Sequence, residues 1–72
     1  IPNKEIAKVS DSEESDKELL GHLLLISKKI AEKYNLNDNY RLVINNGADA
    51  GQSVFHIHVH LLGGRGLTWP PG

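Results

Sequence analysis

An alternation of polar and apolar residues near the end of the chain is its clearest pattern. It covers residues 52–62, and a period of two is typical of a β-strand that is buried on one face. The apolar face would carry Phe55, Ile57, Val59 and Leu61, and the opposite face His56, His58 and His60. The pattern therefore predicts a strand with a row of three imidazoles on its open face.

A second pattern predicts one long helix over residues 16–34. Apolar side chains recur there at helical spacing, namely Leu20, Leu23, Leu24, Ile30, Ala31 and Tyr34. Leu19, Leu25 and Ile26 widen this apolar face, which indicates burial on more than one side, under a sheet or against a second subunit. His22 lies inside the helix without a polar partner at helical spacing, and we interpret it as an ordinary helix residue.

The segments between and around these elements are short. Asparagines in residues 35–39 predict a helix stop and a turn, and residues 40–45 read as a second strand. The loop of small residues 46–51 joins the two strands, most simply as an antiparallel pair. The acidic segment 10–18 is expected to be a solvated helix start. Pro2 makes residues 1–9 an edge-strand end or loop, and the tail 63–72 cannot continue a central strand.

Composition limits the classes of function. The chain has 72 residues, a net charge of −1 and no cysteine, which allows one domain and no disulfide or thiolate metal cluster. No basic cluster favours a nucleic acid or an anionic membrane surface, and no apolar run is long enough to span a bilayer. We expect a cytoplasmic address, or nuclear by diffusion. The opening Ile1-Pro2-Asn3-Lys4 lacks a methionine and reads as the middle of a domain.

Imidazole can act as a metal ligand, a nucleophile or a general base, so three hypotheses compete for the histidine row. A metal site needs at least a third ligand close by. His56 and His60 are ~13 Å apart by strand rise, and no acidic residue follows Asp49. We therefore expect neither a metal nor another cofactor. A polar face that binds a protein or responds to pH stays open as the third hypothesis.

In the second of the three hypotheses, one histidine attacks a phosphorus atom and the neighbouring histidines hold the phosphate. It needs hydrogen-bond donors around the anion, and the loop supplies them. Gly47 and Gly51 allow the backbone to approach an anion closely, and Ser53 adds a hydroxyl. In a regular strand Ser53 would lie on the face opposite to His58. Ser53 can reach the site only if the chain bends between residues 51 and 54.

The same residues resemble the histidine triad (HIT) proteins. Their signature alternates three histidines with apolar residues, as in His56-Ile57-His58-Val59-His60-Leu61-Leu62. Further residues resemble one branch of this family, the histidine triad nucleotide-binding (HINT) proteins. They are Asn45, Gly47, Gly51-Gln52-Ser53-Val54, Leu62-Gly63-Gly64-Arg65, Trp69-Pro70-Pro71-Gly72 and Leu19-Leu20-Gly21-His22-Leu23. The dinucleotide-hydrolase branch lacks the Trp-Pro-Pro-Gly ending and is a weaker match.

The resemblance implies a role for each of these positions. His58 would attack the α-phosphorus of a purine nucleoside phosphoramidate and form a nucleotidyl-histidine, from which water releases AMP. His60 and the backbone of residues 51–53 would bind the phosphate, and His56 would orient the nucleophile. Ser53 would assist the leaving amine. The wider nucleotide site would comprise Asn45, Gly51, Gln52, Ser53, Val54, His58, His60 and Trp69, with Trp69 reaching the neighbouring subunit of a homodimer.

We therefore expect an α+β, HIT-like fold in which one long helix covers an antiparallel sheet. Residues 1–72 would form a single HIT domain, its C-terminal part, with the N-terminal half of the fold missing. Glu5 departs from the HINT pattern, which usually has a histidine there. The expected activity is that of a purine nucleoside phosphoramidase acting on AMP derivatives. The alternative is a truncated, non-catalytic module of the same fold that binds nucleotides or proteins.

Overall fold

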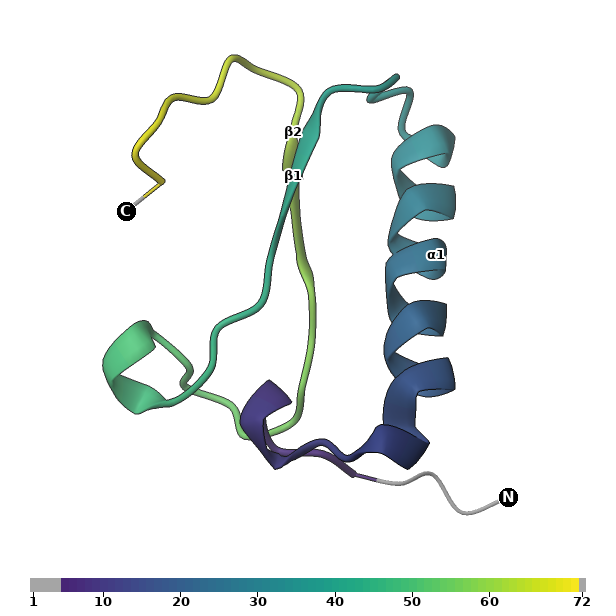
Figure 1. Ribbon diagram of the computed structural model, residues 1–72. Coiled ribbons are helices and arrows are strands. Elements are labelled where there is room, and N and C mark those ends of the chain that lie inside the picture. The colour runs from purple at the N-terminus through teal and green to yellow at the C-terminus, as the bar shows by residue number, and fades with distance from the viewer. Residues whose placement is uncertain (1–4, 72) are drawn as a thin grey trace.

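The computed structural model describes residues 5–71 as one long helix beside a two-stranded hairpin (Figure 1). The elements in chain order are η1 (Val9–Asp11), η2 (Glu14–Asp16), α1 (Lys17–Lys33), β1 (Tyr40–Val43), η3 (Ala48–Ala50) and β2 (His60–Gly63), where η marks a single 3-10 turn. The expected α+β arrangement of a long helix and an antiparallel strand pair is confirmed. The prediction for residues 1–4 lies outside the described residues.

Local signals flank α1 on both sides. Directly before it, the 3-10 turn η2 has a capping box between Glu13 and Asp16, in which the Glu13 backbone N–H donates to Asp16 Oδ2 at 2.7 Å. After it, Asn35 adopts a left-handed φ of 57°. The Leu36 N–H then donates to Ala31 O at 3.0 Å and the Asn35 N–H to Glu32 O at 3.1 Å. This is the Schellman arrangement, so the predicted helix stop is confirmed.

The turn after α1 carries the chain back to the hairpin. Asn37 has a second left-handed φ, of 59°, as expected for an asparagine-rich turn. Leu36 packs from this turn onto the end of β2, because a Cβ added at Gly63 would lie 2.9 Å from Leu36 Cδ1. Gly63 is therefore the strand position that lets the helix–strand connection approach the hairpin.

β1 and β2 pair in antiparallel register, with Leu42 opposite Leu61 and Val43 opposite His60. The strand predicted over residues 52–62 is shorter than expected: residues 54–56 form a bend, and ladder pairing begins at His60. The reason is that β1 ends at Val43, so the first half of the alternating segment has no strand beside it. The Ile57 N–H instead donates to Ile6 O at 2.7 Å.

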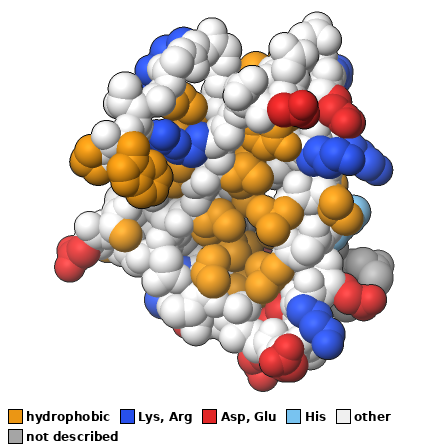
Figure 2. All heavy atoms as spheres, turned by 45° about the horizontal axis from the view of Figure 1, so that its top comes forward, with side chains coloured by type: hydrophobic (Ala, Val, Ile, Leu, Met, Phe, Trp, Pro, Cys, Tyr) orange, Lys and Arg blue, Asp and Glu red, His pale blue; other side chains and the backbone are white. Residues whose placement is uncertain are grey.

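The core is thin. Ile6 and Ala31 are the buried apolar residues of the described chain, at 4% and 0% exposure. Hydrophobic side chains gather at the centre of the face in Figure 2, with charged side chains toward its edges. Several large apolar residues of α1 stay open to solvent, including Leu24, Leu25, Ile26 and Ile30. Within residues 5–71, no helix has the length and hydropathy needed to cross a membrane.

Candidate active site

The three histidines are exposed, and Ile57, Val59 and Leu61 are half-buried. Phe55, which was predicted on the apolar face with them, is instead 52% exposed, because the bend over residues 54–56 interrupts the alternation there. His58 Nδ1 lies 2.7 Å from the backbone oxygen of His56. A carbonyl oxygen only accepts hydrogen bonds, so Nδ1 of His58 carries the proton in this contact. In the neutral ring the lone pair is then on Nε2. The main chain thus prepares His58 to present an unprotonated nitrogen.

His58 and His60 lean toward each other. Their ring centroids are 4.8 Å apart with an interplanar angle of 69°, an edge-to-face contact. Residues two apart on a strand are separated by ~6.6 Å, so the rings converge beyond what the backbone requires. Two exposed imidazoles at this spacing can contact one small anion together.

The loop before the histidines folds tightly around η3. Gly47 and Gly51 flank it with φ values of 93° and 100°, which side chains with a Cβ rarely adopt. The Asn45 side chain lies over Gly51, since a Cβ added at Gly51 would lie 3.8 Å from Asn45 Cγ. The structure therefore brings Asn45 and Gly51 together, as expected for residues of one site.

The backbone donors of this loop are only partly available. The Gly51 N–H donates to Ala48 O at 3.0 Å and the Gln52 N–H to Gly47 O at 3.1 Å. Both groups were expected to bind phosphate, but here they close the loop on itself. Among residues 5–71, the N–H groups of Ser53 and Val54 have no protein acceptor. Both amides could therefore receive an anion.

Gln52 differs from the other predicted site residues because it is buried, at 4% exposure. Its Oε1 accepts from the Gly47 N–H at 2.7 Å, and its Nε2 donates to Ala7 O at 2.5 Å and Val54 O at 3.1 Å. The side-chain amide thus joins the loop to the N-terminal segment. Gln52 shapes the site from beneath, a role that the alternating pattern did not indicate.

Ser53 and Val54 are exposed and lie at the start of the bend over residues 54–56. A bend between residues 51 and 54 was required for Ser53 to reach the histidine side, and the observed bend begins at Val54. That Ser53 approaches His58 stays a prediction.

Trp69 lies in the C-terminal tail. It is 78% exposed, the Arg41 guanidinium carbon lies 5.8 Å from its ring centroid, and Arg41 Nη2 donates to Thr68 O at 2.8 Å. The tail leaves β2 at the end of the hairpin opposite to η3 (Figure 1).

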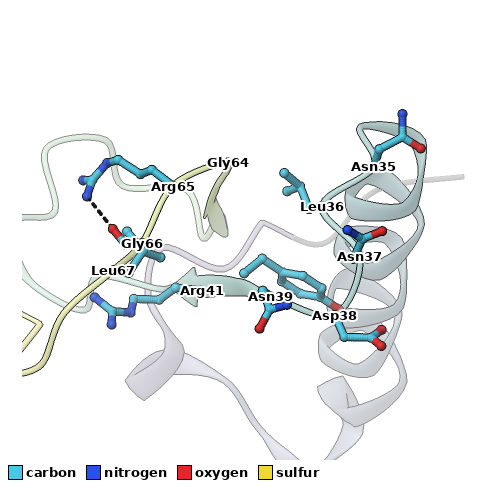
Figure 3. Close-up of a pocket in the computed structure, with 11 residues that line it drawn as sticks. Asn35, Leu36, Asn37, Asp38, Asn39, Arg41, Gly64, Arg65, Gly66 and Leu67 are labelled. Carbon is cyan, nitrogen blue, oxygen red and sulfur yellow. Dashed lines mark hydrogen bonds between the residues drawn. The ribbon is translucent and has the colours of Figure 1, made fainter.

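A groove of about 610 Å³ lies at that opposite end, lined by residues 35–41 and 64–67. Figure 3 shows Leu36 projecting into it from the turn toward Gly64, and Arg65 donating to Gly66 O at 2.9 Å. None of the predicted site residues lines this groove. The histidines are exposed outside this groove.

The described residues 5–71 contain no group of three histidine, cysteine or acidic side chains placed to hold one metal ion. The histidine segment offers two converging imidazoles and a tautomer set by the main chain, and the loop before it offers two free backbone N–H groups and the Ser53 hydroxyl. These parts suit an anionic phosphorus group, because imidazoles and amides can both donate to its oxygens.

Comparison with known proteins agrees with this geometry. A family model described as the HIT domain matches residues 1–67. An uncharacterised HIT-like protein of Synechocystis is 53% identical over the whole chain, which spans 63% of that protein. A HIT family hydrolase from Legionella pneumophila superposes with a TM-score of 0.91 at 51% identity, over 100% of this chain and 65% of that one. A HIT family hydrolase from Clostridium thermocellum gives 0.85 at 40% identity, over 94% and 60%. The chain therefore belongs to the HIT-domain family and spans less than two thirds of the length of these relatives.

Proposed function

We propose that the protein is a hydrolase of purine nucleoside phosphoramidates, of the HINT branch, and that it releases AMP through a nucleotidyl-histidine. The observation that carries the proposal is the contact between His58 Nδ1 and His56 O at 2.7 Å on an exposed ring. Because this contact places the proton on Nδ1, the lone pair of the neutral His58 ring is on Nε2. Two similar proteins with solved structures are named HIT family hydrolases, which supports hydrolysis as the reaction class.

In the first step, Nε2 of His58 attacks the α-phosphorus and the bond from phosphorus to the leaving nitrogen breaks. The electron pair of that bond stays on the amine, which takes up a proton that comes from solvent water and would be relayed by the Ser53 hydroxyl. His60 and the free N–H groups of Ser53 and Val54 would donate to the phosphate oxygens. Preorganised donors of this kind stabilise charge as it develops.

In the second step, a water molecule attacks the phosphorus of the nucleotidyl-histidine. The Nε2–phosphorus bond breaks, its electron pair returns to His58, AMP leaves with the added oxygen, and the proton of the water is released to solvent. Splitting the hydrolysis in this way replaces one difficult displacement by two easier ones. Asn45, beside Gly51, would contact the ribose and phosphate, and no metal is required.

The proposal includes a homodimer formed through α1 and the C-terminal tail. Support comes from the exposed apolar residues of α1 and from Trp69, whose ring is 78% exposed. A tail that reaches a second copy would place Trp69 near the leaving group of that copy. The open face of the histidine row fits a site that is walled by further polypeptide.

The first prediction tests the nucleophile. Incubation with adenosine 5′-phosphoramidate should release AMP, and His58→Ala should lower kcat by a factor on the order of 10³ or more. His22→Ala removes an exposed helix histidine outside the site and should keep the wild-type rate. Mass spectrometry of the acid-quenched wild-type protein should detect an AMP adduct that the His58→Ala protein lacks. Equal AMP release by wild type and His58→Ala, or none by either, would remove the proposal.

A non-catalytic nucleotide-binding module is the second candidate. The observation in its favour is that the Gly51 and Gln52 N–H groups, which were expected to bind phosphate, are bonded within the loop. Binding of AMP without turnover of the phosphoramidate would support this candidate. Calorimetric titration with AMP, run beside the activity assay, separates the two.

A further inference from the structure

Glu5 lies beside the histidine row, although it is far away in sequence. Its Oε1 is 3.9 Å from Nδ1 of His56, within ion-pair range. Both side chains are largely exposed, at 75% for Glu5 and 61% for His56. The contact is not one of the predicted site contacts, and it introduces a carboxylate next to the residue whose backbone oxygen holds His58.

Buried main-chain contacts bring Glu5 to this place. Directly after it, Ile6 is buried at 4% exposure and its carbonyl accepts from the Ile57 N–H at 2.7 Å. One residue further, the Ala7 carbonyl accepts from Gln52 Nε2 at 2.5 Å. These two hydrogen bonds hold the N-terminal segment against the start of the histidine segment. The position of Glu5 is therefore fixed by the fold, even though its side chain is in solvent.

The chemistry of the pair determines what Glu5 can do. At 3.9 Å the contact is longer than a hydrogen bond, but the negative charge of an ionised carboxylate attracts a proton on the nearer ring nitrogen, so it favours a His56 ring whose Nδ1 carries a proton. The lone pair of neutral His56 is then on Nε2, as in His58. Among residues 5–71, the His56 ring has no other ion pair or hydrogen bond that would orient it.

We propose that Glu5 is a positioning residue that orients His56 and selects its Nδ1–H form. The inference rests on the proposed function, because it concerns the histidine that orients the nucleophile. Since the pair is solvent-exposed, its effect is small and salt-dependent. Glu5→Gln should lower kcat/KM by roughly two- to fivefold, mainly through kcat. Glu5→Asp keeps the charge and should recover part of the loss.

The decisive test does not depend on activity. Long-range ¹H–¹⁵N spectra of the imidazole rings distinguish the Nδ1–H form from the Nε2–H form for each histidine. In the wild-type chain at low salt, neutral His56 should populate the Nδ1–H form more than His22 does. Glu5→Gln should shift His56 toward Nε2–H and leave His58 in the Nδ1–H form. Glu14→Gln, which removes an exposed carboxylate from η2, should change neither ring.

Unchanged His56 signals in Glu5→Gln would overturn the inference, whatever the enzyme assay gives. If the spectra change as expected while the wild-type protein releases no AMP, the positioning contact holds and the proposed function fails. If AMP is released but Glu5→Gln has wild-type kcat, KM and spectra, the proposed function stands without Glu5.

Discussion

Gln52 shows how much of this site depends on a single side chain below it. Its amide bonds to the Gly47 N–H and to the carbonyls of Ala7 and Val54, and it is 4% exposed. It therefore joins the glycine loop, the N-terminal segment and the bend that begins the histidine segment. A change at Gln52 acts on the geometry of the site without removing any group that would touch the substrate.

Gln52→Ala should lower the free energy of unfolding by about 1–3 kcal/mol, because the Gly47 N–H and the Ala7 carbonyl lose their partner in a buried place. Urea denaturation followed by circular dichroism measures this difference. Ser53→Ala, at the exposed neighbouring position, serves as the control and should stay within about 0.5 kcal/mol of wild type. Equal midpoints for Gln52→Ala and Ser53→Ala would show that the amide contacts carry no stability.

The exposure of the histidines could be predicted from the sequence because alternation is a local property, and all three are exposed. Phe55 was expected on the buried face and is 52% exposed, because the bend over residues 54–56 is not a local feature of the alternation. Gln52 fits the same alternation as a polar residue, so its burial was missed. That burial depends on Ala7, 45 residues away, and no local pattern carries such a contact. The contact between Glu5 and His56, which are far apart in the sequence, was missed for the same reason.

Secondary-structure elements were predicted well where their signals are local. The helix was expected over residues 16–34 and is found at Lys17–Lys33, because apolar spacing, acidic residues before it and asparagines after it all lie within a few residues of its ends. The strand over residues 52–62 was predicted too long. Alternation gives the face of each side chain, whereas a ladder needs a neighbouring strand, and only His60–Gly63 has one.

Gly21 offers a test of α1 as an element. It lies within the helix, is exposed, and a Cβ added there would meet nothing within 4 Å. Gly21→Ala should therefore raise the free energy of unfolding by about 0.5–1 kcal/mol, since alanine loses less backbone entropy in a helix.

The contrasting variant is Gly47→Ala, which also has open space around the added Cβ but a φ of 93°. It should lower the free energy of unfolding by roughly 1–2 kcal/mol, because an L-residue is strained in that region. Thermal and urea unfolding of both variants give the comparison. A loss of stability in Gly21→Ala would mean that the helix surface at this position is covered by something other than solvent.

At the scale of the whole molecule, the chain has more apolar surface than it can bury. Leu24 is 47% exposed, Leu25 60% and Ile30 43%, all on α1, whereas a covered helix face would hide such residues. Relatives of greater length share the fold at TM-scores of 0.91 and 0.85. A small domain with a thin core gains stability by covering such a face, and a second copy of the chain is the partner proposed above.

Leu25 tests this proposal, since its 60% exposure means that its removal takes little from the core of the single chain. In a two-fold symmetric dimer the residue occurs twice, so each substitution removes two buried side chains from the interface. At about 1.5–3 kcal/mol for a fully buried leucine, Leu25→Ala should weaken association by at least about tenfold, and Leu25→Asp should abolish it. Light scattering coupled to size exclusion, over a dilution series, measures the mass. Lys17→Ala, at the start of the same helix, should keep the wild-type mass at every concentration. If Leu25→Asp also does so, the apolar face of α1 is not where two copies meet.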